Sequence, residues 1–408
     1  MKILIVSQYF WPEDFRINDL TIGLCQAGHE VTVLTGQPNY PGGKIFPGYG
    51  WFKNTRQDYG GVMVRRVPLI PRGRGGALRL MLNYLSFAIF STLLAPFYCR
   101  GKVDAIFVFE PSPITVGLPA ILLRRIKRAP VLFWVLDLWP DSLSATGAVQ
   151  SPLILRGVER LVCFIYRRCD LILVQSRGFI EHVQRHGGAA EKIRYFPSWA
   201  EALYQPLPPA PEQVPAMPGG FRIMFAGNVG VAQDFGTILD AAQRLHRRKD
   251  IHWLIVGDGR LLEWVRQQVE ARGLSDTVHL FGRYPVAAMP AFFAMADVML
   301  VSLKRAPIFE LTIPGKIQSY LACARPLLVM LDGEGARIVK EAGAGLTCPA
   351  QDAVALERAV LTMAAMPKLE REAMGQAGRR YYEANFDRAM LFQRVEGWMR
   401  ELAVVARD

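Results

Sequence analysis

The sequence predicts two successive α/β domains, each a doubly wound, Rossmann-like parallel sheet covered by helices. Short β-branched and aliphatic runs alternate with helical patterns along the chain. This alternation stops once, in a proline-rich segment, and then restarts. With 408 residues, 51% of them apolar, the chain can bury two cores and would be oversized for one domain.

The first domain is predicted over residues 1–198. The strands 2–7 (KILIVS) and 30–35 (EVTVLT) flank a helical pattern that Gly28 ends. Such apolar and β-branched runs are typical of strands that a parallel sheet covers on both faces. Later strands are predicted at 62–67, 104–109, 130–136 and 170–175.

The proline-rich segment is interpreted as an interdomain linker at residues 199–220. Seven prolines occupy the 24 positions from Pro197 to Gly220, too many for regular structure. The second domain is predicted over 221–386. Residues 387–408 form a helical pattern that we expect to pack back on the first domain. Strands of the second domain are predicted at 221–227, 251–257, 277–282, 296–303 and 325–331.

The six cysteines are scattered, with no C-x-x-C pair and no His/Cys spacing typical of zinc sites. A disulfide framework is not expected, and a reducing cytoplasm fits best. The N-terminal sequence does not resemble a signal peptide, so we expect a protein that is not exported.

The net charge of +12 is concentrated in the first half of the chain. Residues 1–215 hold 24 Lys and Arg against 15 Asp and Glu, and so carry +9 of it. Such a surface suits nucleic acid or an anionic membrane leaflet, and composition does not choose between them.

The segment from Leu80 to Tyr98 has no charged residue over 19 positions, just enough to span a bilayer. It also holds polar residues and falls where two parallel strands need a crossover helix. We expect an interfacial or partly buried crossover helix, with a plain core helix and a true span as alternatives. Its basic flanks favour contact with a membrane surface through residues 72–102. The flanking cations are Arg72, Arg74, Arg79, Arg100 and Lys102.

The second domain opens with a glycine-flanked turn, GNVG at 227–230, followed by Gln233. Backbone N–H groups of such a turn can cradle a diphosphate, although a tight turn without a ligand gives the same pattern. Gly257, after the next strand, carries a weaker form of this signal.

A second candidate phosphate site begins at Pro314-Gly315, which ends a loop and starts a helix. Lys316 in the first turn opposes the helix macrodipole, so stability alone does not explain it. A phosphate between Lys316 and the helix N-terminus would explain it, and a solvated lysine is the alternative.

Three carboxylates are expected near the carboxyl edge of the first sheet, where α/β proteins place ligand sites. Asp137 and Asp141, in the run DLWPD, follow one central strand, and Glu110 follows another. The alternative for the aspartates is a helix start, with Pro140 in the first turn and an Asp as the cap.

These motifs, in this order and spacing, resemble glycosyltransferase family 4, which has the GT-B fold of two Rossmann-like domains facing across a cleft. The second-domain resemblance rests on GNVG, GDG, VHLFGR and PGKIQSYLACARP. In the first domain, QYFWPEDFRINDL, GHEVTVLT and WVLDLWPDSLSATG resemble the WbuB-type branch, which transfers N-acetylated deoxyhexosamines in O-antigen and capsule assembly. The resemblance covers essentially the whole chain.

The resemblance implies a retaining transferase that moves a sugar from a nucleotide donor, UDP by expectation, to a lipid-linked saccharide. It implies a cytoplasmic protein peripherally associated with the inner membrane. Catalytic roles would fall to Asp137, Glu310 and Glu110. Donor-binding residues would be Gly227, Asn228, Gly230, Gln233, Gly257, Arg283, Lys304, Pro314, Gly315, Lys316, Gln318 and Ser319. The acceptor side would hold Glu13, Asp14, Asn18 and Asp141.

The chain departs from the family pattern at the donor site. Most members have a Glu-x7-Glu motif that binds the sugar and the ribose, and here Glu310 is followed by Gln318 or Ser319 at the second position. The turn at 227–234 also lacks the Arg and Lys that many members use to neutralise the diphosphate. The compensating cation is expected to be Lys316, Lys304 or Arg305.

No metal or other cofactor is expected. No two aspartates stand two positions apart, so a D-x-D metal clamp is missing from the sequence. His182 and His186 are spaced i, i+4 without a carboxylate between them and are interpreted as solvated. His29, in the turn before a strand, is interpreted as a packing residue or one that makes a local hydrogen bond.

Three other functions are alternatives to glycosyl transfer. A nucleotide-sugar 2-epimerase of the same architecture would not need the basic flanks of residues 80–98. A nucleic-acid-binding protein would fit the pI near 9.5, but no recognition motif is present. A NAD-dependent oxidoreductase would need a G-x-G-x-x-G fingerprint after a first strand, which neither domain has.

Overall fold

The structure, a computed structural model, describes residues 1–73, 76–145 and 149–406. Arg74, one of the expected basic flanks, and Thr146 and Gly147, the last two residues of WVLDLWPDSLSATG, lie outside these residues. The chain divides into two compact units. The first unit comprises Met1–Pro197 with Ala389–Asp408, and the second unit comprises Ser198–Arg388.

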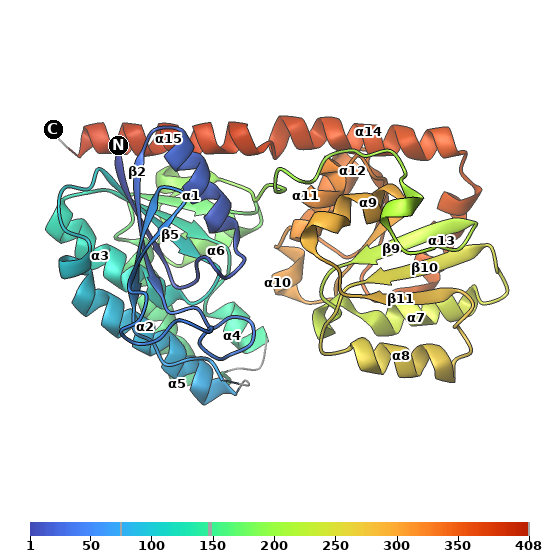
Figure 1. The fold of residues 1–408 in the computed structure, drawn as a ribbon, viewed down its shortest axis with the longest axis horizontal. Helices are drawn as coiled ribbons and strands as arrows, with labels where there is room; N and C mark the ends of the chain where they lie inside the picture. Colours follow the sequence, from blue (N-terminus) through green and yellow to red (C-terminus); the bar gives the residue numbers. More distant parts are fainter. Residues whose placement is uncertain (74–75, 146–148, 407–408) are drawn as a thin grey trace. The chain divides into compact units, whose positions relative to one another are not determined.

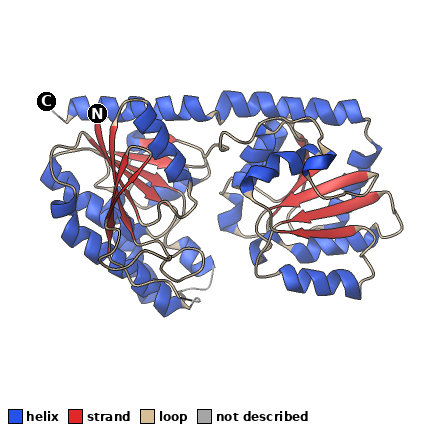
Figure 2. Ribbon diagram, in the orientation of Figure 1, coloured by secondary structure: helices blue, strands red, loops and turns tan. Residues whose placement is uncertain are grey.

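The first unit is an α/β sheet with helices on both faces (Figures 1 and 2). Its strands are β1 (Lys2–Ser7), β2 (Glu30–Gly36), β3 (Arg56–Tyr59), β4 (Val62–Val67), β5 (Ala105–Glu110), β6 (Val131–Val135), β7 (Leu171–Val174) and β8 (Ile193–Tyr195). Its helices are α1 (Arg16–Gln26), α2 (Ala77–Tyr98), η1 (Ile114–Val116), α3 (Gly117–Lys127), α4 (Asp141–Ala145), α5 (Pro152–Tyr166), α6 (Phe179–Arg185), η2 (Ala190–Lys192) and α15 (Arg388–Val405).

The first sheet runs in the order β3-β4-β2-β1-β5-β6-β7-β8. All neighbours are parallel except β3 and β4, and the register pairs Ile3 with Val31 on one side and with Ala105 on the other. The order in which the chain adds strands reverses between β1 and β5, so the carboxyl ends of these parallel strands form the crevice where open α/β sheets bind ligands. Glu110 is the last residue of β5.

The helix α15 packs on the first unit. Trp398 contacts Phe196, with ring centroids 6.0 Å apart, and the Glu396 carboxylate lies 3.0 Å from Nε2 of His29. The other ring nitrogen of His29 lies 3.1 Å from the N-terminal amine of Met1. His29 therefore has the local polar contacts that its position before β2 suggested.

The second unit contains a smaller parallel sheet, again between two layers of helices (Figure 2). Its strands are β9 (Phe221–Ala226), β10 (Ile251–Val256), β11 (Val278–Gly282), β12 (Val298–Ser302), β13 (Leu327–Met330) and β14 (Gly345–Cys348). Its helices are η3 (Pro211–Gln213), η4 (Val231–Gln233), α7 (Phe235–Arg244), α8 (Leu262–Ala271), η5 (Val286–Ala288), α9 (Met289–Ala294), α10 (Pro307–Glu310), α11 (Gly315–Ala322), α12 (Glu334–Glu341), α13 (Ala353–Ala365) and α14 (Lys368–Asn385).

The second sheet runs in the order β11-β10-β9-β12-β13-β14, and every neighbouring pair is parallel. The order in which the chain adds strands reverses between β9 and β12, which places the turn after β9 at the ligand-binding crevice of this unit. Buried residues of β9, β10 and β12 pack with α7, α8 and α13 to form the core beneath it.

The proline-rich segment lies along the second unit. Trp199 is buried, the Tyr204 ring stacks on Phe293 at 5.7 Å, and Arg325 donates to the carbonyl of Leu207 at 3.2 Å. It is therefore held by specific contacts, and not only by the stiffness of its prolines.

Three strands of the structure were not predicted from the sequence. β3 is a polar edge strand, and β8 and β14 are only three and four residues long. Their sequences, RQDY, IRY and GLTC, lack the apolar run that marks a strand buried on both faces. These segments form strands because each pairs with a neighbouring strand, and that pairing cannot be recognised from the local sequence.

Candidate active site

The turn after β9 packs backbone to backbone against the turn after β10. The N–H of Gly227 donates to Val256 O at 2.9 Å, and that of Val229 donates to Asp258 O at 2.9 Å. A Cβ on Gly257 would lie 1.9 Å from Gly227 O, so only glycine fits there. Gly227 and Asn228 are exposed at the surface of this double turn.

Gln233 stabilises the same turn. Its side-chain oxygen accepts the N–H of Gly230 at 3.2 Å, and its carbonyl accepts the Ser302 hydroxyl at 2.7 Å. The structure thus gives Gln233 a role in holding the turn between β9 and β12, which are the two strands at the reversal point.

The helix α11 is anchored to the end of β9 by Tyr320. The Tyr320 hydroxyl donates to Ala226 O at 3.0 Å and accepts from Ala226 N at 3.2 Å. Lys316 lies four residues earlier and therefore on the same helix face. Its Nζ reaches to 3.4 Å from the centroid of the Phe225 ring, beneath Gly227.

Lys316 is buried at its charged end, in contrast to the solvated lysine considered as the alternative. Its stem remains partly accessible, but Nζ is buried and has no hydrogen-bond partner among the residues that the structure describes. Burial lowers the pKa of Lys316 from 10.5 to about 7. A Cβ on Gly227 would lie 3.2 Å from this Nζ, so the lysine extends directly under the exposed turn.

The N-terminus of α11 is held by Gln318. With its amide nitrogen turned toward the backbone, Gln318 donates to Pro314 O at 3.0 Å and Gly315 O at 3.2 Å. Ser319 donates to Gly315 O at 3.4 Å, and both side chains are buried. Neither is therefore placed to contact a ribose in this structure, and both support the turn that carries Lys316.

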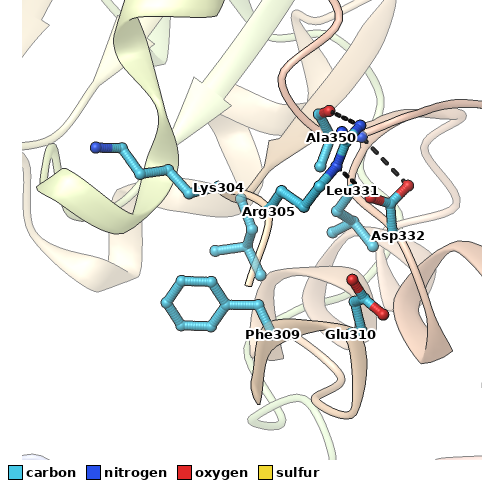
Figure 3. A pocket seen from close by; sticks show the side chains of 8 residues that line it. Lys304, Arg305, Phe309, Glu310, Leu331, Asp332 and Ala350 are labelled. Atoms are coloured by element: carbon cyan, nitrogen blue, oxygen red, sulfur yellow. Dashed lines mark hydrogen bonds and ion pairs between the residues drawn. The ribbon is translucent and has the colours of Figure 1, made fainter. Parts of the chain in front are cut away.

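Glu310 ends the short helix α10 and is exposed beside a shallow pocket (Figure 3). The pocket also contains Arg305, which is engaged by the Asp332 carboxylate at 3.4 Å and by Ala350 O at 2.7 Å. The Lys304 ammonium points away from this group (Figure 3). Of the three candidate cations, Lys316 alone is both uncompensated in the described residues and directed at the glycine turn.

Gly257 and Arg283 lie at the ends of neighbouring strands. The N–H of Gly257 donates to Gly282 O at 2.7 Å, and Arg283 follows Gly282 with an exposed side chain. The crevice of the second unit is therefore bordered by the turns after β9, β10 and β11.

In the first unit, Glu110 and Asp137 lie at the ends of adjacent strands. The N–H of Asp137 lies 3.4 Å from the Glu110 carboxylate, whose other oxygen is buried without a partner among the described residues. Burial, and then the nearby Asp137, raises the pKa of Glu110 well above its usual value. Burial also raises the pKa of Asp137, although the Ser142, Trp139 and Ser112 side chains bond to it.

Asp141 lies in the first turn of α4, at 3.0 Å from Nε2 of His182. The prediction that His182 and His186 are solvated is wrong, because both are buried. Their rings lie 4.2 Å apart, and Nδ1 of His186 lies 2.8 Å from the carbonyl of His182. Burial, and then His186, lowers the pKa of His182 to about 4, so His182 joins α6 to Asp141 of α4 as a largely neutral group.

Glu13 and Asn18 have backbone partners. The buried Glu13 carboxylate accepts the N–H groups of Asn39 and Tyr40, each at 2.7 Å, and burial raises its pKa to about 7. Asn18 accepts from Trp11 N at 3.0 Å and donates to Glu13 O at 2.7 Å. These contacts give both residues a loop-supporting role, and Asp14 is the exposed member of the predicted acceptor set.

Arg72, predicted only as a basic flank, belongs to a cluster with Tyr9 and Tyr40. Its guanidinium lies over the Tyr40 ring at 5.0 Å and the Tyr9 ring at 5.8 Å, and it donates to the Tyr9 hydroxyl at 3.3 Å. The sequence signal for this cluster was Asn83, a polar residue within an apolar helix. Asn83 accepts from Gln8 at 2.7 Å and so ties α2 to the end of β1.

The helix α2 buries three polar side chains and exposes most of its large apolar ones. Asn83, Ser86 and Ser91 are buried, whereas only a third of its most apolar stretch is buried. At 100° per residue, the exposed apolar positions fall on one stripe of the helix. They are Leu78, Met81, Leu82, Leu85, Ile89, Leu93 and Phe97.

An adjoining loop extends this apolar stripe. Trp51 packs edge-on against Phe90 of α2, with ring centroids 5.7 Å apart, and Phe52 is 85% exposed. In the described part of the chain, α2 is the one helix long and apolar enough to cross a membrane. It also packs along β2, β4 and α3, as a crossover helix does.

Within residues 1–73, 76–145 and 149–406, no group of three or more His, Cys, Asp or Glu side chains is arranged to hold a metal ion. The six cysteines are free thiols, of which Cys99, Cys169, Cys323 and Cys348 are buried.

Each of the two units matches a known protein family. Residues 15–199 match the family described as glycosyl transferase 4-like domain, and residues 220–366 match the family described as glycosyl transferases group 1.

Two curated relatives carry related descriptions. The probable glycosyltransferase WbjE of Pseudomonas aeruginosa is 28% identical over 300 residues, covering 70% of this chain and 73% of the relative. The putative colanic acid biosynthesis glycosyl transferase WcaI of Escherichia coli is 27% identical over 339 residues, covering 79% and 81%.

Solved structures share the fold. Sucrose-phosphate synthase from Thermosynechococcus elongatus superposes with a TM-score of 0.77 at 18% identity over 99% of both chains. Anabaena HepE, solved in complex with UDP, gives 0.71 at 15% identity over 98% of this chain and 100% of HepE. Likeness at this level of identity shows the fold alone.

Proposed function

The chain is a glycosyltransferase of the GT-B fold, built from a glycosyl transferase 4-like domain and a glycosyl transferases group 1 domain, and we propose that it moves a sugar from a nucleoside diphosphate to a lipid-linked saccharide at a membrane surface. The observation that carries the donor half is Lys316. A buried amine without an acceptor is costly unless a ligand supplies one. Its place beneath the glycine turn after β9 points to an anion at that turn.

The second unit would hold the diphosphate with three kinds of donor. Lys316 would supply positive charge, the N-terminus of α11 at Gly315 would supply unpaired N–H groups, and the turn at Gly227 would allow close backbone approach. Because charge builds on the diphosphate as the sugar leaves, fixed donors there stabilise the transition state. Glu310, which is exposed, would orient the sugar.

The first unit would receive the attacking hydroxyl. Asp137 and Glu110 place two largely buried carboxyl groups at one crevice, and burial raises the pKa of Glu110 and so favours its protonated form. Asp137 would then accept a hydrogen bond from the acceptor while Glu110 limits the charge at the site. Asp141 and Asp14 remain candidates for contacts with the saccharide.

The relatives support the proposed donor and acceptor classes. HepE was solved in complex with UDP, which supports a UDP-sugar donor. WcaI is described as a putative colanic acid biosynthesis glycosyl transferase, which supports a role in cell-surface polysaccharide assembly. Retention of anomeric configuration, an N-acetylated deoxyhexosamine and independence from metal are parts of the same proposal. An NMR assignment of the product anomer, with EDTA present, tests retention and metal independence together.

Membrane contact is proposed because α2 inverts the usual amphipathic pattern. A crossover helix in water exposes mainly polar groups, whereas α2 exposes a stripe of large apolar side chains and buries three polar ones. Lipid is the one solvent that favours an apolar outer stripe, and Arg79, Arg100 and Lys102 at its ends suit anionic headgroups. Since α2 packs on β2 and β4, it would lie in the interface and not span the bilayer. A cytoplasmic, peripheral protein follows from this proposal.

Sedimentation with vesicles of anionic lipid tests the membrane contact. Ile89→Asp removes an apolar side chain worth roughly 2 kcal/mol when buried, so vesicle affinity should fall at least tenfold. Leu369→Asp on α14, also an exposed apolar residue, is the matched control and should bind as wild type does. Equal binding by all three proteins would contradict the proposal.

The donor half is tested by thermal shift with UDP, GDP, dTDP and CMP, in EDTA, on wild type and Lys316→Met. We expect one diphosphate to stabilise wild type selectively and to lose this effect in the variant. Lys340→Met on α12, an exposed lysine of the same unit, should respond as wild type does. No shift with any nucleotide would contradict the donor assignment.

A further inference from the structure

Lys316 is surrounded by groups that cannot neutralise a charge. Phe225 covers Nζ, and the Tyr320 hydroxyl on the same helix is already bonded to both backbone groups of Ala226. The carboxylates on the adjoining turns, Asp234 and Asp258, contribute nothing to its pKa, which burial alone lowers to about 7. Asp258 is occupied within its own turn by the N–H of Gly259 at 2.7 Å.

A buried amine in such surroundings favours its neutral form, because the ammonium ion loses its hydration without gaining a partner. The aromatic face of Phe225 opposes this effect only weakly, since a cation–π contact offsets a small part of the lost hydration. In the free protein, Lys316 therefore favours the neutral form, although a bound diphosphate would need the charged form.

We infer that Lys316 is largely neutral in the free enzyme and takes up a proton from solvent when the diphosphate of the donor binds, so that nucleotide binding by this enzyme is proton-linked. This inference rests on the proposed donor site. The incoming oxyanions supply the partner that the buried amine lacks, and charge-assisted hydrogen bonds then favour the ammonium form. The proton moves from solvent to Nζ, and no other bond changes.

The linkage has a defined direction. Below about pH 7 the amine is charged with or without ligand, so binding takes up no proton. Above about pH 7 the free enzyme lacks the proton and the complex keeps it, so each further pH unit should weaken binding by up to tenfold. The effect ends where the raised pKa of the complex is reached.

Calorimetric titration with UDP tests the inference at about pH 8, above the second phosphate ionisation near 6. Wild type is titrated in two buffers of different ionisation enthalpy, and the difference in observed heat gives the protons taken up. We expect net uptake by wild type, and a dissociation constant that rises by up to tenfold between about pH 7.5 and 8.5.

Three variants separate this inference from the donor assignment. Lys316→Arg keeps a permanent charge and should bind UDP without proton uptake and with little pH dependence. Lys316→Met should bind weakly without uptake, and Lys340→Met should match wild type. Tight UDP binding by wild type with no proton uptake would overturn the inference and leave the donor site standing. No binding of any nucleotide at any pH would overturn both.

Discussion

Replacing Lys316 by methionine should stabilise the protein while it removes donor binding. The drop in the pKa of Lys316 from 10.5 to about 7 corresponds to about 5 kcal/mol of unfavourable burial at pH 7, at about 1.4 kcal/mol per pH unit. Because the lysine stem stays partly accessible, we expect roughly half of this. Methionine also packs favourably on an aromatic ring such as Phe225.

The gain should appear as a melting temperature higher by about 5–10 °C for the unit of Ser198–Arg388, at about 2–4 °C per kcal/mol. It should also shrink as pH rises. Unfolded Lys316 binds a proton up to pH 10.5 and folded Lys316 only up to about 7, so wild type gains stability between these values. The variant does not.

Differential scanning fluorimetry of both proteins at about pH 7 and 9 measures this difference, with Lys340→Met as the control. The reasoning is refuted if Lys316→Met melts below wild type at pH 7, or if the difference between them does not change with pH. A structural lysine with a hidden acidic partner would give either result.

Other side chains give further predictions. Glu110→Gln should leave the fold at least as stable at pH 7, since burial raises the pKa of Glu110 and favours its protonated form; urea unfolding measures this. Wild type, but not this variant, should lose stability as pH rises from about 4.5 through that raised pKa. Asp137→Asn should lower kcat by about 10²-fold or more with little change in donor KM, measured by steady-state kinetics, if it contacts only the acceptor. Glu310→Gln should lower kcat and leave UDP affinity within about threefold, because the proposed role of Glu310 is to orient the sugar and not to bind the diphosphate. Addition of EDTA should leave the rate unchanged within error.

Most of the fold could be predicted from the sequence, because parallel strands that are buried on both faces appear as continuous apolar runs. Strands such as β5 and β9 were predicted within one residue at each end. The edge strand β3 was missed because its four residues are polar and depend on β4 for pairing.

The candidate site was predictable where backbone chemistry marks it. Gly227 and Gly257 were recognisable because their turns need glycine, and Lys316 because it opposes the helix dipole. That its amine lies buried under Gly227 depends on the Tyr320 contact between α11 and β9, which no local pattern contains.

Side-chain partners were the least predictable part. Gln318 was expected at a ribose, yet it faces the carbonyls of Pro314 and Gly315, which lie within one turn of it. His182 was expected in solvent, yet it lies on α6 and contacts Asp141 of α4. In both cases the sequence gives the residue type, and tertiary packing decides what it contacts.

Transfer itself is the most direct test of the account. Wild type is incubated with a radiolabelled UDP-sugar, EDTA and membranes that carry lipid-linked saccharides, and the organic-soluble fraction is counted. The account predicts that label enters this fraction with wild type, and falls sharply with Lys316→Met and with Ile89→Asp. Label that stays in a nucleotide sugar, or appears as its free 2-epimer, would contradict it.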